Sequence, residues 1–181
     1  MKPRPLPAHI SSLLDTFAAS PRLVAHLTLV HDVACTLIAR LDEIWPSLTY
    51  DRDAVRIGTA IHDIGKIQHP EELSAPGNKH EAAGESVLLA HGFPAIDARF
   101  ARTHGQWETT PNATLADLLV VWADNLWRGK RNESLEAAIC QEIVRQTNET
   151  QWQAFLALDD IATAITADAD ARISWQSQQP I

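Results

Sequence analysis

The segment "GTAIHDIGKIQHP", residues 58–70, places a histidine and an aspartate side by side at the end of an apolar run. Helical neighbours at i and i+1 do not face each other, so His62 and Asp63 do not form a helical ion pair. A buried imidazole and a buried carboxylate each need a partner, because leaving either group unpaired in the core is costly. A metal ion would satisfy both side chains at once, provided that other segments supply further ligands.

Other potential ligands lie on the apolar stripes of separate helical segments. The chain has eight histidines, and four of them lie on or at the edge of such stripes, as do two aspartates. The expected metal ligands are His31, His62, Asp63, His80, His104 and Asp124. A mixed set of imidazoles and carboxylates suits a divalent transition metal, namely Mn, Fe, Co, Ni or Zn.

Several other catalytic and metal-binding motifs are missing from the sequence. The segment "HEAAG" lacks the second histidine of a zinc-protease helix. There is no Glu-x-x-His of a di-iron bundle and no Cys-x-x-Cys of a zinc ribbon. Neither Gly-x-Ser-x-Gly nor a phosphate-binding glycine loop occurs. These absences disfavour the common alternatives to a histidine–aspartate metal site.

The periodicity of the apolar residues predicts an all-α fold. Apolar positions recur every 3.6 residues, and no long stretch alternates with period two. We expect a helical bundle of about seven helices, with short connections and loose ends at residues 1–7 and 176–181. The expected helices span about 21–44, 51–65, 79–91, 94–104, 114–128, 133–147 and 150–174. The motifs "NKHE" and "TLAD" predict capping boxes at the third and fifth of these helices.

Composition and charge bound the class of protein. With 181 residues, 45% hydrophobic and 21% charged, the chain is expected to form one domain over residues 1–181. A net charge of −8 argues against a nucleic-acid-binding surface, and no nucleic-acid partner is expected. No apolar run approaches a membrane span and no secretory signal begins the chain, so we expect a cytoplasmic protein without a membrane partner. Cys35 and Cys140 are expected to be core residues without a disulfide.

The ordered motifs resemble those of a known family. His31, "HDIGK" at 62–66, "HEAAGE" at 80–85, "RTHGQW" at 102–107 and "VVWADNLWRGKR" at 120–131 together resemble the HD superfamily of metal-dependent phosphohydrolases. The resemblance covers about residues 20–131 and implies an HD-type helical domain of the single-domain type, with helices 133–174 added at its C-terminal end. In that family the first His, the His-Asp pair and the last Asp hold one metal, and two intermediate histidines complete a binuclear site. The resemblance therefore implies two ions, with His80 and His104 as ligands of the second.

The first ligand has two candidates on one helix. The gap from His31 to His62 is 62 − 31 = 31 residues, which fits two helices and their turn as in the family. His26 also lies on the apolar face of this helix, and the segment that follows it can also be aligned with the family's motif around the first histidine. We prefer His31 because its gap needs no inserted turn, and His26 stays as the alternative. The neighbouring Asp32 makes a second His-Asp pair that we expect to face away from the site.

The predicted function is metal-dependent hydrolysis of a phosphate ester or anhydride, with a nucleotide as the favoured small phosphorylated substrate. Asp63 is expected to bridge two ions, and a metal-bound hydroxide to attack phosphorus. The catalytic residues are then Asp63 and Lys66, and the expected substrate-binding residues are Lys66, Arg128, Lys130, Arg131 and Trp107, the last by stacking on a nucleobase.

The same residues suit two functions other than hydrolysis. A non-catalytic sensor could bind metal and nucleotide without turnover. A purely structural metal site is disfavoured, because structural zinc has four closed ligands and no spare carboxylates. Assembly into a homodimer stays open.

Overall fold

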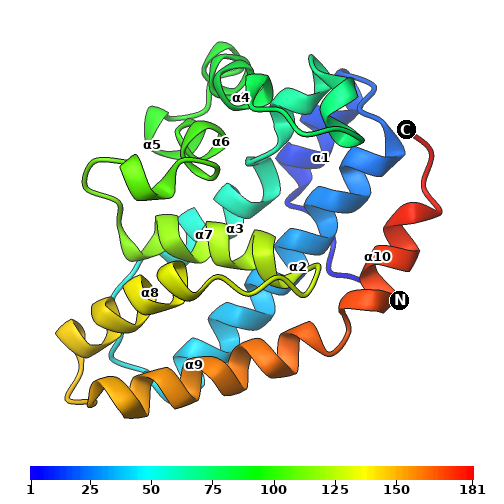
Figure 1. Cartoon of the computed structure of the whole chain (residues 1–181). Coiled ribbons are helices and arrows are strands. Elements are labelled where there is room, and N and C mark those ends of the chain that lie inside the picture. The colour runs from blue at the N-terminus through cyan, green and yellow to red at the C-terminus, as the bar shows by residue number, and fades with distance from the viewer.

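The computed structural model describes residues 1–181 and contains helices without a single strand, which confirms the all-α prediction. Eight longer helices and several short turns follow one another along the chain (Figure 1). The helices are α1 (Ala8–Thr16), α2 (Pro21–Ile44), α3 (Arg52–Ile61), α4 (Lys79–Ala90), α5 (Ala95–Ala98), α6 (Phe100–Thr103), α7 (Leu115–Leu126), α8 (Glu133–Gln146), α9 (Gln151–Thr166) and α10 (Ala169–Ser177). The 3₁₀ turns are η1 (Ile64–Ile67), η2 (Pro70–Leu73) and η3 (Trp107–Thr109).

Helix α2 is the central element of the fold. It begins with Pro21 at its first position, behind Ser20, whose hydroxyl accepts a hydrogen bond from the Leu23 N–H. It packs on α3, α7, α9 and α10 (Figure 1). By length and composition α2 could cross a membrane, contrary to our expectation that no segment approaches a span, but 61% of its most apolar window is buried inside the protein. Its apolar composition therefore reflects a core helix, and the cytoplasmic location stays a prediction.

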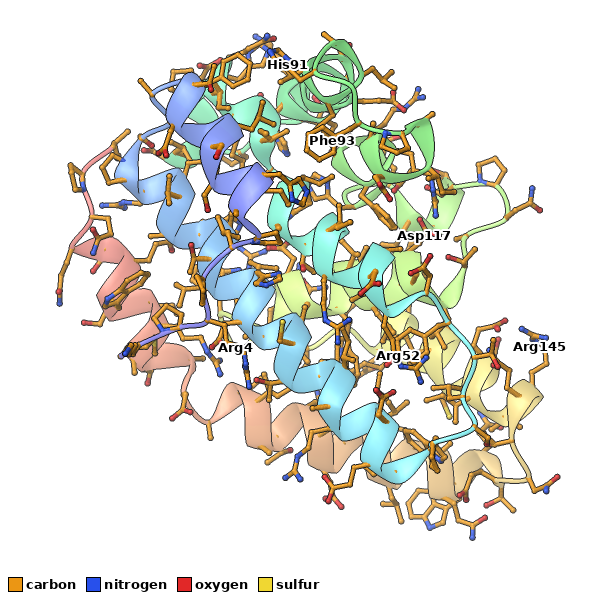
Figure 2. The ribbon with its side chains drawn as sticks, turned by 180° about the vertical axis from the view of Figure 1, so that it is seen from behind. Arg4, Arg52, His91, Phe93, Asp117 and Arg145 are labelled. Atoms are coloured by element: carbon orange, nitrogen blue, oxygen red, sulfur yellow. The ribbon has the colours of Figure 1, made fainter.

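The connection from α2 to α3 is held by buried and ionic contacts. Trp45 and Leu48 are buried in the core, and the Asp51 side chain accepts a hydrogen bond from the Ala54 N–H at 2.9 Å, which caps α3. The guanidinium of Arg52 pairs with Asp42 at 2.8 Å and donates to the Leu48 carbonyl (Figure 2). These contacts fix the position of the first turn of α3 relative to α2. They therefore also fix the position of the C-terminal end of α3, where His62 and Asp63 lie.

The turn that follows the His-Asp pair packs directly on α4. A Cβ atom placed on Gly65 would lie 1.9 Å from the carbonyl oxygen of His80 and 2.6 Å from the amide nitrogen of Gly84. Only a residue without a side chain allows the two backbones to approach this closely. The contact brings η1 against α4 and so places Asp63 beside His80.

Most helices match the predicted ranges, and the differences lie at their ends. The capping box predicted for α7 is present, with Thr114 and Asp117 each bonding the other's backbone N–H. The box predicted for α4 is absent, since Asn78 makes no side-chain cap and Glu81 instead accepts a hydrogen bond from Gln106. The range 94–104 contains two short helices, and 150–174 is interrupted after Thr166 to give α9 and α10.

The two ends of the chain are more ordered than predicted. Leu6 is buried, and the side chain of Arg4 pairs with Asp32 at 2.8 Å (Figure 2). Helix α1 was not predicted from the sequence and packs beside α2. At the other end, the carbonyls of Gln179 and Pro180 accept hydrogen bonds from Arg22.

Candidate metal centre

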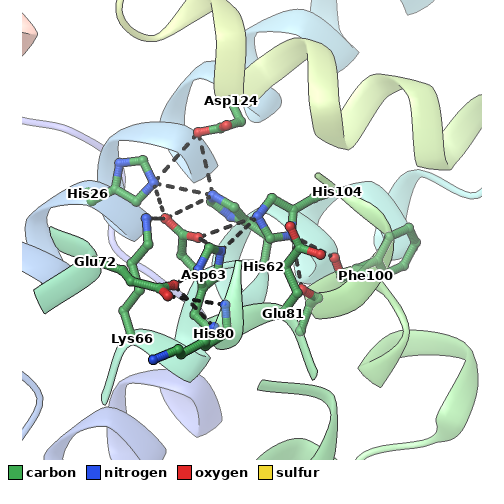
Figure 3. Close-up of polar contacts among 12 residues, drawn as sticks. His26, His62, Asp63, Lys66, Glu72, His80, Glu81, Phe100, His104 and Asp124 are labelled. Carbon is green, nitrogen blue, oxygen red and sulfur yellow. Dashed lines mark hydrogen bonds and ion pairs between the residues drawn. The ribbon is translucent and has the colours of Figure 1, made fainter. Parts of the chain in front are cut away.

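Four imidazoles and two carboxylates converge where the ends of several helices meet (Figure 3). They form two groups, and within each group the potential ligand atoms lie within 4.8 Å of one another. The first group is His26, His62 and Asp124, and the second is Asp63, His80 and His104. Five of the six residues were expected at the site, and the sixth, His26, was the alternative first ligand.

Asp63 lies between the two groups and faces both. Its Oδ2 atom is 3.0 Å from Nε2 of His26, and its Oδ1 atom is 3.1 Å from Nε2 of His80 and 3.4 Å from Nε2 of His104. The carboxylate therefore offers one oxygen to each group. This is the arrangement expected of a bridging ligand.

The adjacency of the His-Asp pair follows from the end of α3. His62 is the first residue beyond the helix, and Asp63 begins the turn that leads into η1. His62 Nε2 lies 3.5 Å from the Asp124 carboxylate in the first group, while the Asp63 side chain reaches the second group. His62 keeps helical backbone dihedrals and Asp63 leaves them, so the two side chains meet at one site, with His62 Nε2 3.7 Å from Asp63 Oδ2.

Three imidazoles are oriented by hydrogen bonds from the nitrogen that faces away from the site. Nδ1 of His62 bonds the Thr59 carbonyl at 3.0 Å, and Nδ1 of His104 bonds the Ala101 carbonyl at 3.0 Å. Nδ1 of His80 bonds the Glu72 carboxylate at 2.5 Å. Since these oxygens can only accept, each Nδ1 carries the proton, and a neutral ring presents an unprotonated Nε2 to the site.

The inward-facing atoms are thus an unfavourable set in the absence of a cation. Nε2 of His80 and Nε2 of His104 lie 3.4 Å apart, and both face Oδ1 of Asp63. With neutral rings all three atoms are acceptors, so no hydrogen bond can form among them. Either extra protons or a cation must lie between them. The residues present therefore fit a pair of divalent metal ions, one in each group.

The electrostatics of the buried site agree with this donor set. Burial alone would raise the pKa of Asp63, but positive charge on the surrounding imidazoles, His62 first, holds it well below its usual value. Despite burial, the carboxylates of Asp63 and Asp124 raise the pKa of His62 in turn. Protonated imidazoles are thus one source of the positive charge that the site needs, and metal ions bound to neutral rings are the other. Burial also lowers the pKa of His26, which favours its neutral form. Asp63 is 3% exposed and His62 is fully buried. The site therefore keeps an ionised carboxylate in the interior, which requires compensating positive charge.

The choice of His31 as the first ligand was wrong. Its Nδ1 atom bonds the carbonyl of Arg56, in the middle of α3, and its Nε2 atom is 3.6 Å from the sulfur of Cys35. His31 follows His26 by five residues, which is about 7 Å along α2 and a rotation of about 140°. The two side chains therefore cannot face the same site.

The reason for the error lies in the length of the α2–α3 connection. The part of α2 from His26 to its C-terminal end is about 27 Å long, whereas α3, which runs back along α2, is only about 15 Å long. The connection 45–51 is not a tight turn, and its extended residues supply the remaining length. As a result, His62 lies beside His26, and not beside His31, along the axis of α2.

A cavity of about 280 Å³ opens onto the two groups of ligands. Lys66 and Arg128 line it, as predicted for substrate-binding residues, and the Lys66 ammonium lies 2.5 Å from Asp63 Oδ2. Lys130 is exposed and does not line the cavity. Arg131 is paired with Glu136 at 2.7 Å and Asp159 at 2.9 Å, away from the cavity.

The tryptophan in the cavity wall is also not the one that was predicted. Trp107 is partly buried against the main hydrophobic core and does not line the cavity, so the structure does not bring it to the place where it was expected. Trp127, three residues after Asp124, lines the cavity and contacts the His26 ring edge-on at 5.1 Å between ring centroids. The i, i+3 spacing from Asp124 was a signal for Trp127. Nothing in the spacing of the motifs indicated Glu72, Leu73 or Gln176, which complete the lining.

The comparison with family models agrees with the geometry. The model described as the HD domain matches residues 25–143, about two thirds of the chain. The chain belongs to the HD domain family. Members of this family bind divalent metals and are largely metal-dependent hydrolases. No curated protein and no solved structure matches the chain.

Proposed function

We propose that this HD-domain protein is a metal-dependent phosphohydrolase that cleaves a phosphate ester or anhydride of a small substrate, with a nucleotide as the favoured class. The observation that carries the proposal is the Asp63 carboxylate, which offers one oxygen to each of two ligand groups beneath a cavity lined by cations. Two adjacent metal sites under a phosphate-sized cavity are the arrangement used for in-line displacement at phosphorus.

The residues at hand could hold two ions without a change of fold. His26, His62 and Asp124 would hold one, His80 and His104 the other, and Asp63 both. When bound, such ions supply a water of lowered pKa and neutralise the charge of a phosphoryl group. The ring orientations set by Thr59, Glu72 and Ala101 mean that little reorganisation of the protein is needed on binding.

Two cationic side chains supply the remaining positive charge. Lys66 leaves the same turn as Asp63 and lies within the cavity, and Arg128 lies one helical turn beyond Asp124. Both can bind the nonbridging oxygens of a phosphate, the lysine as a point charge and the arginine through paired N–H groups. A cation beside the phosphate stabilises the negative charge that develops on its oxygens during the reaction. The cavity therefore provides for phosphate binding beside the expected position of the ions.

The proposal is tested by phosphate release from a panel of nucleotides and simple phosphoesters with added Mn²⁺, Co²⁺, Ni²⁺ or Fe²⁺. We expect turnover in the wild type and a loss of at least about 100-fold in kcat/KM for Asp63→Asn, because an amide cannot bridge two cations. The chain supplies a matched control in its second His-Asp pair. Asp32→Asn removes a carboxylate that pairs with Arg4 at the surface, and its activity should stay within about twofold of wild type.

Circular dichroism confirms that each variant is folded. If no member of the panel is cleaved with any of these metals, while a nucleotide still binds and raises the melting temperature, the hydrolase proposal is wrong and the protein is a nucleotide-binding sensor. Equal activity losses in Asp32→Asn and Asp63→Asn would also contradict it, since they would show a general effect on the fold.

A further inference from the structure

The cavity at the metal centre is partly closed by the C-terminal helix, which lies outside the matched family region. Gln176, near the end of α10, lines the cavity together with Trp127 and Arg128. It follows the last matched residue by 176 − 143 = 33 positions. Figure 1 shows α10 beside the N-terminal half of α2, which carries His26. This wall is therefore a feature of the chain beyond its HD-domain core.

Helix α10 is held against the site at both of its ends. The buried Arg172 donates to the Ile165 carbonyl at 2.8 Å and to the Trp127 carbonyl at 3.5 Å. At the far end, the guanidinium of Arg22 donates to the carbonyls of Ser177 and Gln179 at 3.0 and 2.9 Å. Arg22 precedes His26 by one helical turn, so the tail is fastened beside the first metal-ligand candidate. The side chain of Gln176 is thus carried by a fixed element.

Gln176 differs in chemistry from the rest of the lining. The other polar side chains of the cavity are imidazoles, carboxylates, a lysine, an arginine and an indole N–H, which have roles with cations, with phosphate or in packing. The carboxamide is uncharged at every pH and both donates and accepts hydrogen bonds. Its side chain makes no hydrogen bond to the protein in the structure, and the residue is half-buried. It is therefore available to a ligand.

We propose that Gln176 is a specificity-determining residue that hydrogen-bonds the hydroxyl groups of a sugar attached to the phosphate of the substrate; this rests on the proposed phosphohydrolase function. A sugar hydroxyl donates and accepts in the same way as a carboxamide, whereas phosphate oxygens only accept and are better met by Lys66 and Arg128. The cavity of about 280 Å³ is at the small end of ligand sites. It has room for a phosphate and its adjoining sugar, as in a nucleoside monophosphate, while more distant groups lie outside.

The test compares two non-hydrolysable ligands that differ in the group attached to phosphorus. One is the 5′-methylene phosphonate analogue of adenosine monophosphate, and the other is benzylphosphonate, which has no hydroxyl groups. Titration calorimetry on the Mn²⁺-loaded full chain gives their affinities for wild type, for Gln176→Ala and for the control Gln178→Ala. Gln178 is exposed at the end of the same helix and does not line the cavity.

We expect Gln176→Ala to weaken binding of the nucleotide analogue by about 3- to 10-fold, the range for one or two lost hydrogen bonds. Benzylphosphonate binding should change by less than about twofold, and Gln178→Ala should leave both affinities unchanged. The inference is overturned if Gln176→Ala leaves the analogue's affinity unchanged, or weakens both ligands equally. It is also overturned if wild type binds the analogue no more tightly than benzylphosphonate.

A separate measurement distinguishes this inference from the proposed function. Phosphate release from adenosine monophosphate and phenyl phosphate by the wild type reports on hydrolysis alone. Turnover of both substrates, without a selective loss of nucleotide binding in Gln176→Ala, means that only the inference fails. Absence of turnover with any phosphoester means that the proposed function fails, whatever the calorimetry shows.

Discussion

The orientation of single imidazole rings decides what the site can bind. His62 and His104 donate their outward Nδ1 protons to backbone carbonyls, and His80 donates to the Glu72 carboxylate. Because the outward nitrogens are donors, the inward nitrogens are free to act as ligands. Glu72 is the only side chain among these partners, so its contribution can be tested by substitution.

Glu72→Leu should weaken metal binding at the second group by about 10- to 100-fold and leave the first group unchanged, because the His80 ring and the backbone N–H groups of Lys79 and His80, all at the start of α4, lose their partner. Titration with Mn²⁺ gives both affinities, and the ¹⁵N chemical shifts of His80 report its tautomer. Glu71→Leu is the matched control, since Glu71 is exposed and its carboxylate pairs with His69, which lies outside both groups. Equal losses at the two groups would show that Glu72 acts on the fold and not on His80.

Lys66 presents its ammonium 2.5 Å from the Asp63 carboxylate and also lines the cavity. Lys66→Met should keep both metal sites, since removal of a neighbouring positive charge does not disfavour cation binding. It should lower kcat/KM for a phosphoester by about 10- to 100-fold, because a phosphate-binding cation is lost. Metal analysis and phosphate release on the same preparation check both parts. Loss of metal in Lys66→Met would contradict this role.

At the scale of the helices, the position of each helix along the axis of its neighbour determines which side chains meet. The close backbone contact between η1 and α4 depends on Gly65, whose added Cβ would overlap the His80 carbonyl. The contact therefore positions Asp63, which precedes η1, against His80 of α4. A substitution at Gly65 tests this packing without changing the side chain of any candidate ligand.

Gly65→Ala should destabilise the protein by about 2–3 kcal/mol, since backbone and not a flexible side chain must move. It should also weaken the second metal site, because Asp63 and His80 separate. Gly92→Ala is the control: its Cβ meets open space, and only its positive φ costs about 1 kcal/mol. Chemical denaturation and Mn²⁺ titration measure the two effects. A Gly65→Ala protein with unchanged metal affinity would refute the positional role of this contact.

The sequence predicted the helices and five of the six residues that converge at the candidate site, because both depend on local patterns. Apolar periodicity predicted the range of α2, and "TLAD" predicted the start of α7. The choice between His26 and His31 depended on the length of the α2–α3 connection, which is set by tertiary contacts such as the Arg52–Asp42 pair. Periodicity does not report such contacts, and the simplest assumption, a tight turn, selected the wrong histidine.

Gln176 and Glu72 were missed for a different reason. Both come from segments that reach the site through long-range packing, Gln176 through the hydrogen bonds of Arg22 and Arg172, and Glu72 from a 3₁₀ turn before α4. Their side chains carry no characteristic spacing relative to the ligands. Only the three-dimensional structure shows that they line the cavity.

At the scale of the whole molecule, the candidate metal ligands come from segments that are spread over most of the chain. They come from α2, the end of α3, α4, the residue after α6, and α7, so bound ions would hold five segments together. Without positive charge the buried carboxylate of Asp63 and its acceptor neighbours oppose folding. Metal binding and global stability should therefore be coupled.

Mn²⁺ at about 100 times the dissociation constant of each site should raise the melting temperature by about 11–22 °C, since such an excess adds about 2.7 kcal/mol per site to the free energy of unfolding and a domain of this size gains about 2–4 °C per kcal/mol. Excess chelator should reverse the shift. Differential scanning calorimetry checks this, with Asp63→Asn expected to show less than half of the wild-type shift. An equal shift in Asp63→Asn would mean that Mn²⁺ binds elsewhere.

The most direct test of the central claim, a two-metal centre that begins at His26, is elemental analysis of folded protein after loading with Mn²⁺ and removal of free metal. We predict about two equivalents per chain in the wild type and in His31→Ala, because the His31 ring contacts Arg56 and Cys35 and not the site. His26→Ala should lose about one equivalent. One equivalent or less in the wild type, or loss of metal in His31→Ala with retention in His26→Ala, would contradict the account.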